Sequence, residues 1–266
     1  MLSGELDYRG REVLPPDKRE WKELTQRLSS HSENPLVAIV SKFSHRNNIF
    51  ETELKAYLEN EIPNVHIALG SEWGKSNFYR RSLTTYLNLA CTELFSNFRC
   101  NLKKAVISRG FNGPLRILKA DGGVFPLERI RPVESIYSGP AASILGALAQ
   151  SEPEESFIVV DIGGTTTDIG LVLGGSPLLS FKGAQIDNFL THIRSLATRS
   201  ITVGGDSTII NRNGEIIISN YRTGPAYCMG GNSPTPTDAM RYLNYIKIGS
   251  YQKAEEALAE LLPENE

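Results

Sequence analysis

The sequence predicts an α/β protein, and two stretches of different character carry that prediction. Between residues 36 and 149, short apolar β-type runs alternate with segments whose apolar residues recur at helical spacing. Residues 156–182 instead predict a β-meander, in which neighbouring strands are joined by tight turns. The acidic run 151–155 separates the two stretches. We therefore predict a first domain over residues 1–150 and a second over 151–266.

The predicted first domain combines strands and helices. Its expected strands are 36–40, 65–69, 104–108 and 115–119, and its expected helices are 16–28, 50–58, 80–98 and 138–148. Ser138 and Pro140 indicate where the last of these helices begins, since serine is a frequent helix cap and proline is tolerated in a first turn.

The predicted second domain begins with the meander. Its expected strands are 156–162, 167–173, 177–182, 208–211 and 215–219, and its expected helices are 186–196 and 251–262. Gly174-Gly175 is a two-residue hairpin signal, and residues 211–214 predict a second tight turn.

Composition excludes several classes of protein. Hydrophobic residues make up 40% of the chain and charged residues 22%, and the net charge is −2, which gives no electrostatic reason to bind nucleic acid or an anionic membrane. The three cysteines show no metal-binding or disulfide spacing, which favours a reducing compartment. No apolar run approaches the ~18 residues of a membrane span, and the first residues do not resemble a signal peptide. We expect a cytoplasmic protein.

The most informative segment runs from Asp161 to Asp168. Two apolar strands flank a turn built from small and hydroxyl-bearing residues, namely Gly163, Gly164, Thr165, Thr166 and Thr167. Glycines let a backbone approach an anion closely, and two carboxylates beside a phosphate make sense when a divalent cation lies between them. The segment predicts a hairpin that binds a magnesium–nucleotide phosphate, with water between the carboxylates and Mg²⁺. The alternative is an ordinary hairpin with a polar turn.

A second glycine segment follows a predicted strand that begins at Ser200. Gly204 and Gly205 would let a ligand lie against the backbone, and Asp206 and Ser207 would then bind a hydroxyl-bearing group. Alternatively, Asp206 is simply the N-cap of a helix.

Three further features have weaker support. The corner 119–124 lies at a strand end, where α/β sheets bind ligands, but Asp-Gly is also a common turn pair. The glycine–proline loop 223–239 holds Cys228 and predicts a helix cap at Thr237 or Asp238, and its length favours a functional role. No histidine lies near Cys228 in sequence, so a nucleophilic thiol is disfavoured. His45 is the histidine best placed for a site, although a solvated loop histidine is the better explanation.

With these segments in order, the chain resembles the hydantoinase/oxoprolinase family (the hydantoinase A domain), a branch of the actin-like ATPase superfamily. The resemblance runs from about residue 36 to 245 and rests on four strings in the family's order, namely 138–147, 161–168, 204–207 and 224–239. It implies an actin-like ATPase (ribonuclease H-like) fold, with part of lobe I, a connector helix from Ser138, and lobe II. By resemblance, Asp161 to Asp168 forms the second phosphate hairpin and Gly204-Gly205 lies on the adenosine side.

The resemblance also implies ATP and Mg²⁺ as cofactors and hydrolysis of cyclic amides or imides, such as hydantoins or 5-oxoproline, or a related carboxylase role. Relatives carry a first phosphate hairpin in an N-terminal lobe, and nothing before Leu36 has that form. They also usually have His-Glu where this chain has Phe50-Glu51. We therefore expect a complementary subunit or a homo-oligomer to complete the site. The competing hypotheses are a non-catalytic actin-like nucleotide-binding module and a truncated inactive paralogue. No residue indicates which ring is the substrate.

Overall fold

The structure is a computed structural model that describes residues 1–32 and 34–261. It divides into two units, each made of two separate stretches of chain. Unit 1 comprises residues 1–141 and 179–196, and unit 2 comprises residues 142–178 and 197–266. This division differs from a boundary at residues 150 and 151, because 142–150 joins unit 2 and 179–196 returns to unit 1.

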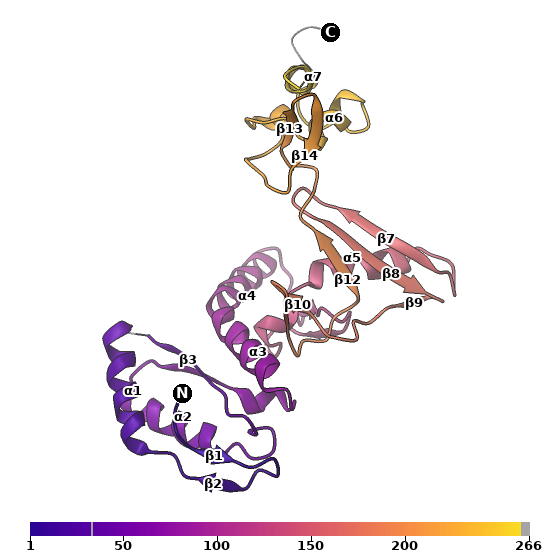
Figure 1. The fold of residues 1–266 in the computed structure, drawn as a ribbon. Coiled ribbons are helices and arrows are strands. Elements are labelled where there is room, and N and C mark those ends of the chain that lie inside the picture. Colours follow the sequence, from indigo (N-terminus) through magenta and orange to yellow (C-terminus); the bar gives the residue numbers. More distant parts are fainter. Residues whose placement is uncertain (33, 262–266) are drawn as a thin grey trace. The chain divides into compact units, whose positions relative to one another are not determined.

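Unit 1 combines helices with small two-stranded sheets (Figure 1). Its helices are α1 (Lys18–His31), α2 (Ile49–Glu61), α3 (Phe78–Ala90) and α4 (Thr92–Ile107), with short 3-10 helices η1 (Gly70–Trp73) and η2 (Pro132–Ser135). Its strands are β1 (Glu5–Leu6), β2 (Glu12–Leu14), β3 (Leu36–Ile39), β4 (His66–Leu69), β5 (Arg116–Leu118), β6 (Val124–Pro126), β10 (Gln185–Ile186) and β11 (Phe189–Leu190). The pair β3–β4 is parallel, whereas β1–β2, β5–β6 and β10–β11 are antiparallel.

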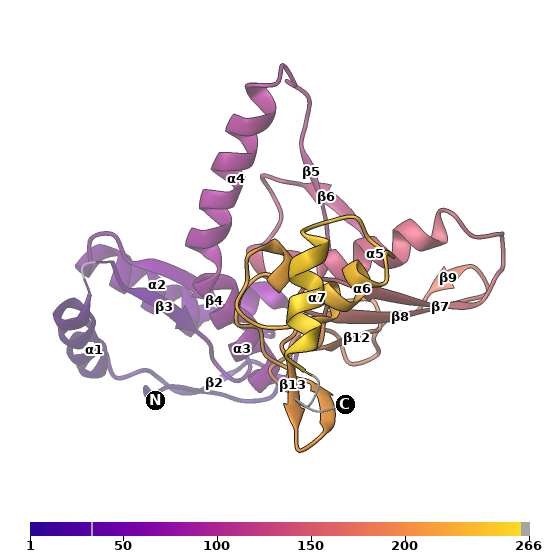
Figure 2. The same ribbon diagram turned by 90° about the horizontal axis from the view of Figure 1, so that it is seen from above.

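The parallel pair β3–β4 lies at the centre of one core of unit 1. Helix α2 connects the two strands, and α1 and α2 pack beside them (Figure 2). Their buried apolar side chains form one cluster, which consists of Trp21, Ile39, Leu54, Leu58, Ile62 and Leu69. This core holds the carboxyl ends of β3 and β4 in register, with Ile39 opposite Leu69.

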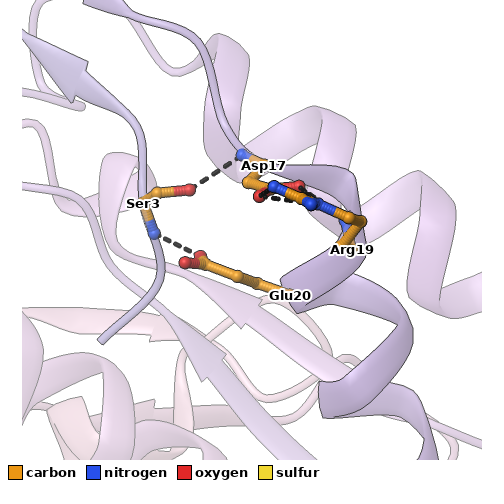
Figure 3. A network of polar contacts seen from close by, with 4 residues as sticks. All are labelled: Ser3, Asp17, Arg19 and Glu20. Carbon is orange, nitrogen blue, oxygen red and sulfur yellow. Dashed lines mark hydrogen bonds and ion pairs between the residues drawn. The ribbon is translucent and has the colours of Figure 1, made fainter.

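The N-terminal residues are fixed to the start of α1 by a small polar network (Figure 3). The backbone N–H of Asp17 donates to Ser3 Oγ at 2.8 Å, and the N–H of Ser3 donates to Glu20 Oε2 at 2.5 Å. Asp17 is itself the N-cap of α1, since its side chain accepts a hydrogen bond from Arg19 N. The contacts of the Asp17 and Arg19 N–H groups satisfy donors that the first turn of a helix leaves unpaired.

Three expectations for unit 1 were wrong. The apolar periodicity over 80–98 belongs to two helices, α3 and α4, separated at Cys91. The expected strand at 104–108 is the last turn of α4, because a short apolar run fits either element and here continues a helix. The expected helix 186–196 is instead the β10–β11 hairpin. Asp187 and Asn188 take φ of 46° and 68° in its turn, which a helix cannot accommodate.

Unit 2 is built around an antiparallel sheet (Figure 1). Its strands are β7 (Phe157–Ile162), β8 (Thr167–Leu173), β9 (Ser176–Pro177), β12 (Thr198–Ile201), β13 (Ile209–Arg212) and β14 (Glu215–Ile218). Its helical elements are α5 (Ser138–Leu148), which begins at the end of unit 1, η3 (Tyr227–Met229), α6 (Pro236–Tyr242) and α7 (Tyr251–Ala259). The sheet order is β12-β8-β7, with β9 paired to β8, and β13–β14 is a separate hairpin.

Helix α5 packs directly on this sheet. A Cβ at Gly170 of β8 would collide with Ile144 of α5, so the small residue permits close packing. Gly170 lies opposite Val159 and Thr198 in the neighbouring strands, and directly opposite residues point to the same face. Every second residue of β7 and β8 from this position, including Asp161 and Asp168, therefore points toward the α5 side.

The first two strands of the meander and both tight turns are confirmed. Gly174 and Gly175 join β8 to β9, and the β13–β14 turn has φ of 56° at Asn213 and 88° at Gly214. The third strand was predicted too long, since β9 ends at Pro177.

The C-terminal helix is present as α7 and ends at Ala259, with Glu260 as its C-cap. Its predicted end at residue 262 lies outside the described residues. Within residues 1–32 and 34–261, no helix is both long enough and apolar enough to span a membrane.

Candidate functional site

The predicted phosphate hairpin is formed by β7 and β8. Its turn closes with a hydrogen bond of 2.9 Å from Gly163 N to Thr166 O. The register places Asp161 directly opposite Asp168, one residue pair away from the turn. Asp161 is exposed and Asp168 is half-buried, so both carboxylates lie beside the turn within reach of solvent.

The two aspartates form an electrostatically unfavourable pair. Like charges directly opposite one another in a sheet are destabilising. Ser143 of α5 donates a hydrogen bond from Oγ to Asp161 Oδ2, which offsets part of that cost. Carboxylates arranged in this way suit Mg²⁺, which prefers oxygen ligands, keeps several waters and is often bound through one or two carboxylates plus phosphates. In the described part of the chain, no three His, Cys, Asp or Glu side chains converge as a metal site, so water and phosphate would supply the other ligands.

The second predicted segment lies directly on this turn. Gly205 N donates to Gly163 O at 2.8 Å, and Asp206 N donates to Gly164 O at 2.7 Å. The Thr167 hydroxyl donates to Val203 O at 2.7 Å. The structure thus brings together the two glycine segments that the sequence singled out, although they lie about forty residues apart.

The glycines of the second segment have a packing role. A Cβ on Gly204 would lie 2.6 Å from the carbonyl oxygens of both Gly163 and Gly164, and a Cβ on Gly205 would lie 2.8 Å from Thr237 Oγ1. A Cβ on Gly164 would in turn lie 2.9 Å from Asp206 Oδ2. Glycine is therefore required here by contacts within the protein, whether or not a nucleoside also lies beside the segment.

Asp206 and Ser207 are not helix caps, since the next element is strand β13. Asp206 Oδ2 forms an ion pair with Arg222 Nη2 at 3.0 Å. Ser207 is buried, and its Oγ accepts a hydrogen bond from Gly204 N at 2.9 Å. Ser207 thus closes the 204–207 turn, and Asp206 links the turn to Arg222.

Sequence reasoning missed three residues that position this site. Ser143 contacts Asp161, and Arg222 pairs with Asp206. Thr237 donates to Gly205 O from both its backbone N–H and its hydroxyl, each at 2.8 Å. These contacts join residues 16 to 32 positions apart, and no local pattern signals them.

The hydroxyls and N–H groups of the turn divide into two sets. Those of Thr167 and Gly163 are used within the protein, as donors to Val203 O and Thr166 O. Thr165 is exposed and Thr166 half-buried at the tip, beside the exposed Gly164. Gly164, Thr165 and Thr166 are therefore the residues best placed to meet a phosphate.

The loop 223–239 is organised by a buried carboxylate. Asp238 accepts hydrogen bonds from the N–H groups of Tyr227, Cys228 and Thr235. Thr235, and not Thr237 or Asp238, is the N-cap of α6. Burial raises the pKa of the Cys228 thiol to about 11, so this thiol is protonated at neutral pH. The loop shows a structural role for Asp238 and no activated nucleophile at Cys228.

The remaining corner at 119–124 is a tight turn in the β5–β6 hairpin. Asp121 Oδ1 accepts a hydrogen bond from Gly123 N at 3.1 Å, and Asp121 also pairs with Lys119 Nζ at 3.9 Å. This geometry is that of a turn in which Asp bonds the backbone two residues on.

Comparison with known proteins identifies the family. The family model described as hydantoinase/oxoprolinase matches residues 81–263 of the 266 residues. The chain belongs to the hydantoinase/oxoprolinase family. The match covers helix α5, the Asp161–Asp168 hairpin and the 204–207 turn.

Relatives of this family member include subunits of larger enzymes. The caprolactamase subunit alpha of Pseudomonas jessenii is 28% identical over 225 residues, which are 80% of this chain and 32% of that protein. The acetophenone carboxylase gamma subunit of Aromatoleum aromaticum is 24% identical over 279 residues, covering 96% of this chain and 38% of that protein. The chain thus spans about a third of the length of these curated relatives.

Two solved structures share the fold over nearly the whole chain. Acetone carboxylase in a nucleotide-free form matches 97% of this chain and 39% of its own with a TM-score of 0.83 at 18% identity. The ATP-dependent caprolactamase of Pseudomonas jessenii matches 99% and 41% with a TM-score of 0.73 at 25% identity. Both proteins are described as ATP-dependent.

Proposed function

We propose that this chain supplies a magnesium–nucleotide half-site of an ATP-dependent hydrolase that opens cyclic amides or imides of the hydantoin or 5-oxoproline type. The observation that carries the proposal is the pair Asp161 and Asp168, opposite one another beside a glycine–threonine turn. A hairpin without a ligand gains nothing from two facing carboxylates, whereas a bound cation relieves their repulsion. Membership in the hydantoinase/oxoprolinase family agrees with this role.

Each residue of the site has a distinct part in the proposal. Asp161 and Asp168 hold Mg²⁺, mainly through water, and Ser143 orients Asp161. Gly164, Thr165 and Thr166 donate to the phosphates. The turn 204–207 supports the hairpin tip and lines the nucleoside side.

ATP, when bound with magnesium, supplies a phosphoryl group that can turn an amide or carboxylate oxygen into a leaving group. The residues of this chain contribute by positioning and by charge compensation, which do most of the work in phosphoryl transfer. Such an enzyme needs donors on both sides of the phosphates. The proposal therefore includes a complementary subunit or a second copy, in keeping with the relatives that are named as subunits.

The test is calorimetric titration of the purified chain with ATP, with and without Mg²⁺, for the natural sequence and for Asp161→Asn and Asp168→Asn. We expect magnesium-dependent binding that weakens by about tenfold or more in each variant, since one ionic ligand is lost. The nucleotide-free variants should be as stable as the natural chain or more stable, because one of two facing charges has been removed. Asp187→Asn, in the β10–β11 turn, is the matched control.

Two outcomes would count against the proposal. Binding that survives both substitutions would show that the hairpin does not hold the metal. Variants that lose stability along with binding would indicate that the aspartates serve the fold.

A further inference from the structure

The carboxyl ends of β3 and β4 in unit 1 are held by a buried carboxylate. Glu51 of α2 is completely buried. Its Oε1 accepts from Ser41 N and its Oε2 accepts from Ser71 N, each at 2.8 Å. Because Ser41 follows β3 and Ser71 follows β4, Glu51 fixes the two strand ends relative to each other.

A buried guanidinium lies over the same strand end. Arg81 of α3 has no exposed surface. Its Nη2 donates to the carbonyl oxygens of Ser41 at 2.5 Å and Lys42 at 2.8 Å, and its Nη1 donates to Lys75 O at 2.5 Å. The backbone of Ser41 is thus bound on one side by Glu51 and on the other by Arg81.

Three buried polar atoms in this place have no hydrogen-bond partner. They are Ser41 Oγ, His45 Nδ1 and Arg81 Nε, and within residues 1–32 and 34–261 they are the only buried side-chain nitrogen or oxygen atoms without one. Buried polar groups are nearly always paired, and those that are not call for a specific explanation, such as an ordered water or an ion. Two of these atoms belong to the loop after β3, and the third belongs to the arginine that binds this loop, so we infer one missing partner for all three.

The electrostatic surroundings favour an anion as that partner. Lys42 and Arg46 are exposed on the loop that carries Ser41 and His45, and Lys75 is exposed after β4. Of the acidic groups on the flanking elements α2 and η1, Glu51 has both oxygens engaged and Glu72 is exposed. An anion that approaches from solvent meets cationic side chains first and the buried donors behind them.

Two half-buried histidines lie among these cationic side chains. Burial, followed by the charges of Arg81 and Arg46, lowers the pKa of His45. Burial also lowers the pKa of His192. The hydrogen bond to the Asn77 carbonyl acts in the opposite direction, and the charges of Arg80, Arg81 and Lys75 lower the pKa further. A protein with net charge −2 thus holds a local cationic cluster at the carboxyl edge of a parallel strand pair, where α/β proteins usually bind ligands.

We propose that the carboxyl end of β3–β4 binds a small carboxylate, with Arg81 Nε, Ser41 Oγ and His45 Nδ1 as its hydrogen-bond donors. Arginine is well suited to this role, since its planar donors match carboxylate geometry. The choice of a carboxylate over other oxyanions rests on the proposed function, because a ring substrate can carry an acid group beside its amide. The site would then select lactams with a carboxylate over the same ring without one.

The test compares L-5-oxoproline with 2-pyrrolidinone, the same ring without the carboxylate, by calorimetry and by NMR of the His45 imidazole. We expect L-5-oxoproline to bind at least about tenfold more tightly. It should raise the measured pKa of His45, because a nearby anion favours the protonated form, whereas 2-pyrrolidinone should leave that pKa unchanged. Equal affinity for the two rings would overturn the proposal, as would tighter binding of inorganic phosphate that displaces L-5-oxoproline.

Variants separate binding from folding. Arg81→Lys retains the charge but lacks Nε, and it can fail to fold because Arg81 is fully buried. Ser41→Ala removes only an unpaired hydroxyl, so it should weaken L-5-oxoproline binding without lowering the melting temperature of the free protein. Arg46→Gln, at the surface, should weaken binding several-fold in low salt. Lys22→Gln on α1 is the matched control and should change nothing.

Two further results have defined meanings. If neither Ser41→Ala nor Arg46→Gln affects binding, the three atoms are paired by ordered water only and the proposal fails. Magnesium-dependent ATP binding is measured on the same preparation. If the protein binds ATP but shows no preference for L-5-oxoproline over 2-pyrrolidinone, only this inference is rejected. If it neither binds ATP nor prefers L-5-oxoproline, the proposed function is rejected as well.

Discussion

Gly204 shows at the scale of one residue how the candidate site depends on close backbone packing. In Gly204→Ala, the new Cβ would lie 2.6 Å from two carbonyl oxygens of the hairpin turn. Backbone atoms cannot give way as a flexible side chain can, so we expect a loss of about 1–3 kcal/mol in the free energy of unfolding. Chemical denaturation measures it.

Gly146→Ala is the matched control within the same unit. Gly146 lies inside α5, and no atom lies within 4 Å of a Cβ built there. Alanine should stabilise this helix by roughly 0.5–1 kcal/mol. We therefore expect the free energy of unfolding to fall in Gly204→Ala and to rise in Gly146→Ala. A similar decrease in both variants would contradict the packing explanation.

The cysteines should differ sharply in reactivity. Cys228 is 4% exposed, and burial raises the pKa of its thiol to about 11, whereas Cys100 is exposed. Because the thiolate is the reactive form, iodoacetamide at pH 8 should alkylate Cys100 long before Cys228 in the native protein. Mass spectrometry of timed samples checks this order, with the urea-unfolded chain as control. Rapid native labelling of Cys228 would mean that its loop opens readily.

Two half-buried histidines predict a loss of stability in mild acid. The pKa values of His45 and His192 are lowered in the folded chain, so the unfolded chain binds protons first as the pH falls through about 6.5. The free energy of unfolding should therefore be largest above this pH and decrease below it. Denaturant titrations between pH 8 and pH 5 measure the slope.

Substitution assigns this slope to particular residues. His45→Gln and His192→Gln should each flatten the pH dependence of stability. An unchanged slope in both test variants would assign the effect to other groups.

At the scale of elements, α4 differs from the other long helices. None of its residues is buried, and Leu94 is 75% and Phe98 47% exposed. An apolar groove of about 340 Å³ runs beside it, lined by Leu94, Phe95, Phe98 and Ile117 among others. Helix α2, by contrast, buries Leu54 and Leu58 in the core.

Hydrogen exchange should therefore distinguish the two helices. Few buried contacts imply low local stability, so central amides of α4 should exchange at least about tenfold faster than those of α2. Equal protection would show that something covers α4 in solution. Dilution of the protein then tells whether a second copy is responsible, since self-association weakens with dilution.

Sequence reasoning succeeded where local chemistry determines the element. The Asp161–Asp168 hairpin has apolar strands and a turn of small residues. The short turn fixes the register, which places Asp161 opposite Asp168. It failed at 186–196, where apolar spacing suggested a helix but Asp187 and Asn188 adopt positive φ in a tight turn. It could not find Arg222, Thr237 or Ser143, because their roles depend on contacts that only the folded chain creates.

At the scale of the whole molecule, the two units are interleaved along the chain. Residues 179–196 belong to unit 1 although they lie between two segments of unit 2. Ala184 and Ile193 pack with Ala120 and Val133 in a buried cluster. Ala120 O also accepts a hydrogen bond of 2.8 Å from Leu196 N, so this return segment is part of the unit 1 core.

Truncation of Ile193 should therefore weaken unit 1. Ile193 is 3% exposed, and Ile193→Ala should lower the free energy of unfolding by about 2–5 kcal/mol. Hydrogen exchange locates the effect, which should appear around Ala120 and Val133 and be smaller in the β7–β8 hairpin. Phe181→Ala is the control, because Phe181 is fully exposed and lies in the same segment. An effect confined to unit 2 would contradict the assignment of 179–196.

The interleaving also constrains the order in which the protein can mature on the ribosome. A nascent chain that has released its first 150 residues still lacks Ala184 and Ile193, so the cluster around Val133 cannot close. Residues 157–173 of the hairpin emerge next and can pair locally before that cluster is complete. The β7–β8 hairpin thus has the opportunity to form during translation before the first unit has finished folding. Synonymous codons that slow translation after residue 196 should then favour the native protein more than a pause after residue 150.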